Sequence, residues 1–219
     1  MDRRITSAVL VSSLCLVVVS LLAGRAMSDS SPQDFGPPLA GQGDPDAVAP
    51  YRTTPRRVDP AATAGPAQRQ RPVQVRLPAL GVTAPVVPVG VASGGDVQIP
   101  RDGDLVGWYR FGARPGDPAG SAVLVGHRDT LKDGAGALFD LDDVAAGDPI
   151  LVTTRTGETL RYRVTALQSL PKQQLPAERL FAREGRPRLT VITCGGAYLP
   201  EVGGYQENLV VTATLQGRS

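Results

Sequence analysis

From residue 73 onward, short apolar runs alternate with glycine and proline, a pattern that predicts β-strands joined by turns. In Leu160–Val164, apolar and basic side chains alternate, so they fall on opposite faces, as a half-buried antiparallel strand requires. Eight strands within about 145 residues predict an all-β barrel or sandwich over residues 72–219. Two short helices are predicted, near Ala137–Val144 and near Pro176–Arg183. The eight runs are Val73–Leu77, Ala84–Val89, Val97–Ile99, Ala122–His127, Ile150–Thr154, Thr159–Gln168, Arg188–Thr193 and Leu209–Leu215.

The beginning of the chain has a different pattern, a long apolar run. Ile5–Gly24 contains no charged side chain, with Arg3 and Arg4 before it and Arg25 after it. About 20 apolar residues cross a bilayer as a helix, and a basic N-terminal flank favours a cytoplasmic N-terminus. We therefore expect residues 1–27 to be a single-pass transmembrane anchor with the rest of the chain outside the cell. A cleaved signal peptide is the alternative, but the run is longer than the ~7–15 residues of a signal's apolar core.

Between these two parts the composition changes abruptly. Nine prolines lie from Ser28 to Pro72, among Ala, Gly, Ser, Asp and Arg, and the only aromatic residues there are Phe35 and Tyr51. Such a segment has too few apolar side chains to form a core. Residues 28–71 are therefore predicted to be a disordered spacer that holds the β domain away from the membrane.

The charges of the chain are nearly balanced. It has 23 basic and 21 acidic residues, for a formal net charge of +2. Nucleic-acid binding usually needs a concentrated basic field on one face or along one element. We therefore expect no nucleic-acid partner.

The chain has two cysteines in very different places. Cys15 lies in the apolar N-terminal run and Cys194 lies near the other end, so they are poor candidates for a disulfide. An exported β domain would carry Cys194 as a lone thiol into an oxidising compartment, where cysteines are normally paired. A lone exported thiol suggests chemistry, although a buried structural cysteine remains the alternative.

The only histidine, His127, and the cysteine Cys194 each end an apolar predicted strand. A strand end can present a side chain to a cleft and hold it still, as a nucleophile and its base require. Because the thiolate is the attacking form, an imidazole beside it controls the proton. One His and one Cys do not complete a zinc site, which needs about three or four ligands. The residues therefore suggest a catalytic Cys–His pair rather than a zinc site, although each residue alone also fits an ordinary surface or core position.

A more specific pattern surrounds this pair. Gly126-His127 at the end of one strand, followed about 65 residues later by Thr190-Val191-Ile192-Thr193-Cys194, resembles the sortase family of cysteine transpeptidases. The resemblance covers roughly residues 72–215. Within the family, the Gly-His-Arg and Thr-Cys-Gly-Gly segments most resemble the actinobacterial class F and class E groups, with class F preferred.

This resemblance implies an eight-stranded sortase β-barrel that cleaves a Leu-Pro-x-Thr-Gly-like (LPxTG-like) sorting signal between Thr and Gly. Cys194 is expected to form a thioacyl-enzyme, and His127 to protonate the departing amine. An amine of peptidoglycan or its precursor is the expected acceptor. Some sortases bind calcium, but a solvated loop explains the local carboxylates as well, so no cofactor is expected. Those carboxylates are Asp140, Asp142 and Asp143.

One part of the family pattern is missing. Sortases usually place an arginine on the last barrel strand to hold the substrate and stabilise the oxyanion, but Arg218 is the only arginine after Cys194. The expected position falls near Asn208, whose amide can donate a hydrogen bond to an oxyanion. Arg110 and Arg128 are other candidate donors, although strand alternation sends Arg128 to the opposite face from His127. Further contacts with the substrate or oxyanion are expected from the neighbours of the nucleophile, Thr193 and Gly195.

Other functions fit the sequence less well. Papain-like cell-wall peptidases place Cys before His and begin a helix at the nucleophile, whereas here His127 comes first and Cys194 ends a strand. The Ser-x-Gly-Cys motif of L,D-transpeptidases is absent. Two alternatives remain: an exported cysteine hydrolase that acts on peptides, and a catalytically silent barrel that only binds sorting signals, as the missing arginine suggests.

Overall fold

The computed structural model describes residues 33–38 and 70–219. The predicted anchor, residues 1–27, and most of the predicted spacer lie outside the described residues. Within the described ranges, no helix has the length and apolar character needed to cross a bilayer.

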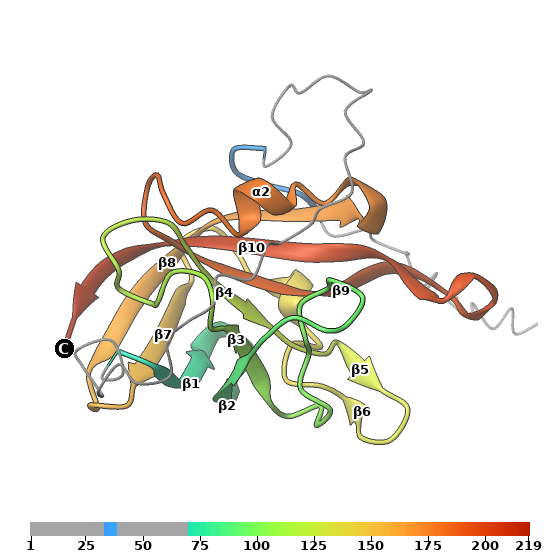
Figure 1. Cartoon of the computed structure of the whole chain (residues 1–219), viewed down its shortest axis with the longest axis horizontal. Helices are drawn as coiled ribbons and strands as arrows, with labels where there is room; N and C mark the ends of the chain where they lie inside the picture. Colours follow the sequence, from blue (N-terminus) through green and yellow to red (C-terminus); the bar gives the residue numbers. More distant parts are fainter. Residues whose placement is uncertain (1–32, 39–69) are drawn as a thin grey trace, which may run out of the picture. The chain divides into compact units, whose positions relative to one another are not determined.

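The β domain is a closed barrel of eight strands, as the sequence predicted (Figure 1). Around the barrel the order is β1-β2-β3-β4-β9-β10-β8-β7, and β7 pairs with β1 to close it. A separate two-stranded hairpin, β5 (Asp129–Thr130) and β6 (Gly134–Ala135), lies beside it. The barrel strands are β1 (Pro72–Leu77), β2 (Val82–Val89), β3 (Val106–Tyr109), β4 (Ser121–Val125), β7 (Pro149–Thr154), β8 (Thr159–Pro171), β9 (Arg188–Leu199) and β10 (Gly204–Arg218).

One predicted strand is wrong. The run Val97–Ile99 forms no strand, and only Val97 makes an isolated bridge, to Val91. The run is three residues long and ends at Pro100, which lacks a backbone donor for a ladder. The eighth strand is β3 instead. All four of its residues are buried, so it shows none of the period-two alternation that marks a half-buried strand.

The predicted helices are shorter than their sequence patterns suggested. The run Ala137–Val144 contains only the 3₁₀ helix η2 (Leu141–Asp143), because the backbone is already extended at Val144. The run Pro176–Arg183 contains the single-turn helix α2 (Ala177–Leu180). The remaining 3₁₀ helices of the described residues are η1 (Pro78–Leu80), η3 (Lys172–Gln174) and η4 (Pro200–Val202).

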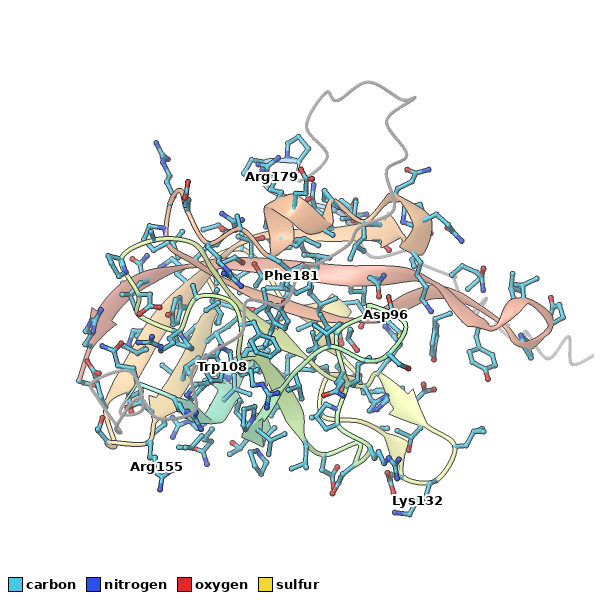
Figure 2. The ribbon with its side chains drawn as sticks, in the orientation of Figure 1. Asp96, Trp108, Lys132, Arg155, Arg179 and Phe181 are labelled. Carbon is cyan, nitrogen blue, oxygen red and sulfur yellow. The ribbon has the colours of Figure 1, made fainter. Side chains whose placement is uncertain are left out.

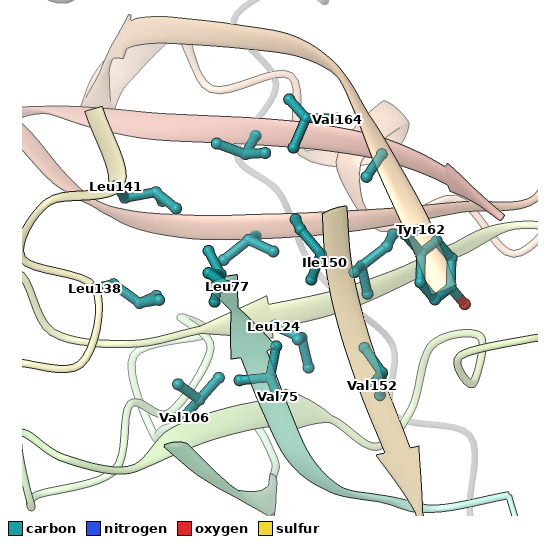
Figure 3. Close-up of a cluster of buried hydrophobic side chains, with 14 of the residues drawn as sticks. Val75, Leu77, Val106, Leu124, Leu138, Leu141, Ile150, Val152, Tyr162 and Val164 are labelled. Carbon is teal, nitrogen blue, oxygen red and sulfur yellow. The ribbon is translucent and has the colours of Figure 1, made fainter. Parts of the chain in front are cut away.

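The barrel wall separates two apolar clusters. The inner cluster fills the barrel, and Figure 3 shows Leu77, Leu124 and Ile150 from three strands gathered in it. The outer cluster lies on the other face of β4, where Val123 and Val125 alternate with the inward-facing residues. Because both faces of β4 are covered, all five of its residues are buried. This double burial gives the strand that precedes His127 a rigid setting.

Candidate active site

The parallel pairing of β4 with β9 brings the predicted catalytic pair together. Val125 lies opposite Ile192 in the register, and His127 and Cys194 each follow two residues later. The pairing continues past the end of β4, because the Gly126 N–H donates to the Ile192 carbonyl at 3.1 Å. Continuing the register therefore sets His127 and Cys194 level on neighbouring chains, with side chains on the same face.

That face is the outside of the barrel. Val125 and Ile192 belong to the outer cluster, and strand alternation gives Cys194 the face of Ile192. Both His127 and Cys194 are partly exposed, and Cys194 is a free thiol. A partly exposed thiol beside two tightly packed strands can be reached by a peptide, so the alternative of a buried structural cysteine does not fit.

The imidazole of His127 is oriented by the main chain. Its Nε2 lies 2.8 Å from the carbonyl oxygen of Pro100. A carbonyl can only accept a hydrogen bond, so Nε2 carries the proton and Nδ1 is the basic nitrogen of the neutral ring. The sequence could not reveal Pro100 as a partner, because a backbone carbonyl is present at every position.

Thr193 ties the two catalytic strands together directly before the nucleophile. Its hydroxyl donates to the Gly126 carbonyl at 3.0 Å, and the bond is buried. Gly126 must itself be small, because a Cβ there would lie 2.8 Å from Leu138 Cδ1. Thr193, predicted as a substrate contact, therefore uses its hydroxyl within the fold.

The glycines after Cys194 have a packing role. A Cβ on Gly195 would lie 2.6 Å from Leu209 Cγ of β10, so this buried position accepts only glycine. Gly196 has φ +71°, the left-handed region that other residues rarely adopt. The close approach of β9 to β10 thus depends on these two glycines, and Gly195, predicted as a substrate or oxyanion contact, also has this packing role.

Asn208 lies directly across from Cys194 in the β9–β10 ladder. Directly opposed residues place their Cβ atoms about 4.5–5.5 Å apart on the same face, so the Asn208 amide reaches the space next to the thiol. On the far side of Asn208, Leu170 of β8 lies opposite it. The position at which the sequence expected a replacement for the family arginine is therefore adjacent to the nucleophile.

The two arginines proposed as alternatives are engaged elsewhere. Arg110 is exposed, and its guanidinium lies 4.8 Å from the centre of the Phe111 ring. Arg128 forms an ion pair with Asp142 at 3.0 Å and lies over the Phe139 ring at 5.5 Å. Asn208 is thus better placed than either arginine.

In the acidic stretch considered for calcium, one carboxylate forms a local ion pair. Asp142 pairs with Arg128, and the backbone N–H of Asp143 donates to the carbonyl of Asp140 within η2. Among the described residues, no group of three or more His, Cys, Asp or Glu side chains is arranged to hold a metal ion.

Tyr205 is a site residue that the sequence reasoning missed. Its hydroxyl donates to Asp129 Oδ2 at 2.9 Å, which joins the start of β10 to the chain just after His127. Burial raises the pKa of Tyr205, and the hydrogen bond to Asp129 and the nearby charges of Asp129 and Cys194 raise it further. Tyr205 therefore lies within electrostatic reach of the nucleophile and remains a hydrogen-bond donor at neutral pH.

A barrel of this topology with a histidine and a cysteine level on two parallel strands defines the sortase class. A family model of the sortase domain matches residues 75–216, which is more than half of the chain. The chain belongs to the sortase family.

Solved sortase structures share the fold at low sequence identity. Sortase A from Corynebacterium diphtheriae is 23% identical with a TM-score of 0.50, and the match covers 67% of this chain and 62% of that one. Sortase C-1 from Actinomyces oris is 23% identical with a TM-score of 0.50, covering 66% and 71%. Sortase C1 from Streptococcus agalactiae is 20% identical with a TM-score of 0.52, covering 67% and 70%. No match was found among curated protein sequences.

Proposed function

We propose that this protein is a sortase-type cysteine transpeptidase that acts on an LPxTG-like sorting signal. The observation that carries the proposal is the level placement of His127 and Cys194 at the ends of paired strands, on a partly exposed face. A nucleophile and a proton carrier held side by side on rigid strands are what covalent acyl transfer needs.

The first half of the reaction follows from the two side chains. The Cys194 thiolate attacks the carbonyl carbon of the Thr residue, and collapse of the tetrahedral intermediate breaks the Thr–Gly C–N bond. The leaving nitrogen takes a proton from the His127 imidazolium, which leaves a thioester on Cys194. Since Nε2 donates to Pro100, Nδ1 is the nitrogen that gives up this proton.

The second half regenerates the enzyme. An amine from peptidoglycan or its precursor attacks the thioester, and Nδ1 of His127 takes its proton. The C–S bond then breaks, which returns Cys194 as a thiolate and releases an amide product. Water in place of the amine would give a hydrolase.

The oxyanion needs a donor in both halves, and we assign this role to Asn208. Its side chain is on the face of Cys194 and one strand away. An amide N–H donates without a full positive charge, so Asn208 fills part of the role of the family arginine.

We further propose that the protein is of class F, or else class E, on the segments Gly126-His127-Arg128 and Thr193-Cys194-Gly195-Gly196. Residues 1–27 are proposed to anchor it in the membrane, with residues 28–71 as a spacer and the barrel outside the cell. Protease added to intact protoplasts should remove the barrel. Protection of the barrel would refute export, and release of a mature chain that begins near Met27 would support a signal peptide.

The activity is tested by incubating the full-length protein with a pool of Leu-x-x-Thr-Gly peptides and a set of amines, with the products read by mass spectrometry. Ligated peptides establish a transpeptidase. Products of water alone establish a hydrolase, and intact peptides favour the silent binding barrel.

A further inference from the structure

A short piece of the proline-rich region lies along the barrel. The N–H of Phe35 donates to the Leu167 carbonyl at 2.9 Å, and the N–H of Leu167 donates to the Phe35 carbonyl at 3.0 Å. The two residues form an antiparallel bridge. Figure 1 shows this piece in blue beside β8 and α2.

The bridge forms where β8 has no barrel neighbour on one side. The pairing of β7 with β8 reaches Arg163, whereas β8 continues to Pro171. An unpaired strand edge accepts an extended segment through its main-chain groups. The carboxylate of Asp34 accepts from the N–H of Ser169 at 2.8 Å and so occupies the next donor along the edge.

The side chains of this segment also pack closely against the barrel. Phe35 is half-buried and packs against the inner cluster, to which its partner Leu167 belongs. Gly36 has φ +88°, and a Cβ there would lie 2.4 Å from both the Ala166 Cβ and the Thr165 carbonyl oxygen. Only glycine combines a left-handed backbone with the absence of a Cβ, so the close contact of the segment with β8 depends on Gly36.

The same segment also binds α2. The Pro38 carbonyl accepts from Arg179 Nη1 at 3.0 Å. In Figure 2, Arg179 lies on the side of α2 away from the barrel strands, and Phe181 lies toward them. The Phe181 ring packs edge-on against Tyr109 of β3, at 5.2 Å between ring centres.

Residues 34–38 therefore contact both the last part of β8 and helix α2 in the connection that follows it. Ser169 lies before this connection and Arg179 lies within it, on α2. The connection packs on the outer face of the strands that end in His127 and Cys194, because its apolar residues share the outer cluster with Val125 and Ile192. The residues of the connection in this cluster are Leu175, Leu180 and Phe181, and Leu170 near the end of β8 packs against it as well.

We propose that Asp34–Pro38 is an in-chain docking motif that completes the free edge of β8 and braces the β8–β9 connection beside the active-site face. The docking part stands on the structure alone, whereas its effect on turnover rests on the proposed function. Release of the motif is expected to loosen this connection and weaken peptide binding without disturbing the catalytic strands.

Amide hydrogen exchange of the full-length protein, resolved by residue, tests the docking. In the parent, the amides of Leu167 and Ser169 are expected to be protected. Gly36→Val should raise the exchange rates of both amides by about tenfold or more, because it removes the bridge. Asp34→Ala should raise chiefly the exchange rate of the Ser169 amide, whose acceptor it removes. Gln33→Ala, at an exposed position next to the motif, is the matched control and should change neither amide.

Amides of β10, such as that of Val211, report global folding and should be equally slow in every variant. Unprotected Leu167 and Ser169 amides in the parent, or equal protection in parent and Gly36→Val, would overturn the docking motif. The Asp34→Ala variant keeps the test decisive if Gly36→Val folds poorly.

Steady-state ligation of a sorting peptide tests the bracing. Gly36→Val should raise KM by about threefold or more with kcat little changed. The variant loosens the β8–β9 connection beside the peptide but leaves His127 and Cys194 in place. An unchanged KM in a variant with released amides would overturn the bracing role. If the parent protein shows no turnover, the proposed function fails, while the exchange experiment still decides the docking.

Discussion

At the scale of single residues, the hydrogen bond from His127 Nε2 to Pro100 fixes the tautomer of the imidazole. His127 is the only histidine in the chain, so the ring nitrogens of a histidine-labelled sample report on this site alone. We predict a protonated, pyrrole-type Nε2 and an unprotonated, pyridine-type Nδ1 in the ¹⁵N spectrum of the neutral ring. The reverse assignment, or an equal mixture of tautomers, would show that the Pro100 carbonyl does not orient the ring.

A second residue-scale prediction concerns the oxyanion donor. Asn208→Ala should lower kcat by about 10²–10³, as expected for the loss of one oriented donor. Arg110→Ala is the matched control and should leave kcat within a few-fold, because its guanidinium lies over Phe111. Kinetics that separate kcat from KM make the comparison. If Asn208→Ala changes kcat no more than Arg110→Ala does, backbone donors around Gly195 become the better hypothesis.

At the scale of elements, two buried hydrogen bonds tie β4 to β9 at opposite ends. Thr193 donates to the Gly126 carbonyl beside the catalytic pair, and Ser121 and Thr190 share a bond of 2.8 Å at the other end. Thr193→Val and Thr190→Val should each lower the free energy of unfolding by about 1–3 kcal/mol, because each leaves a buried polar group unpaired. Denaturant unfolding measures this.

Only Thr193→Val should also lower kcat, because only that bond sets the spacing of His127 and Cys194. Equal kcat losses in Thr193→Val and Thr190→Val would mean that general destabilisation, not local positioning, controls activity.

The elements also show how far a sequence can be read. A strand with one buried face, such as β8, can be predicted from its alternation of apolar and polar residues. β3 is buried on both faces, so its sequence has no such alternation. The residue types of His127 and Cys194 indicated their chemistry. The strand pattern predicted a barrel or a sandwich, and the family resemblance indicated the barrel. Pro100 and Tyr205 were not visible, because their roles arise from tertiary contacts between distant loops. The docking of Phe35 was hidden for the same reason, within a composition typical of disorder.

At the scale of the whole molecule, ionisation of Tyr162 should make the free energy of unfolding depend on pH in the alkaline range. Its side chain is buried and its hydroxyl accepts from the Gly116 N–H at 2.8 Å. Burial raises its pKa to about 12, from 10. The unfolded chain therefore loses this proton first, and the free energy of unfolding should fall by about 3 kcal/mol as pH rises from about 10 to about 12.

Tyr162→Phe should flatten this part of the pH profile, although it lowers stability at neutral pH by leaving the Gly116 N–H without its acceptor. Tyr198→Phe, at a position that is 53% exposed, is the control and should keep the parental slope. A parental slope in Tyr162→Phe would show that other groups govern the alkaline loss.

The central claim is that Cys194 forms a thioester with the sorting peptide. Intact-mass spectrometry of the full-length protein, incubated with an LPxTG-like peptide and no amine, tests it most directly. We predict an acyl adduct that maps to Cys194, disappears when an amine is added, and is absent in Cys194→Ala. His127→Ala should slow its formation by about 10²–10⁴. Peptide cleavage by Cys194→Ala at a rate comparable to the parent would contradict the account.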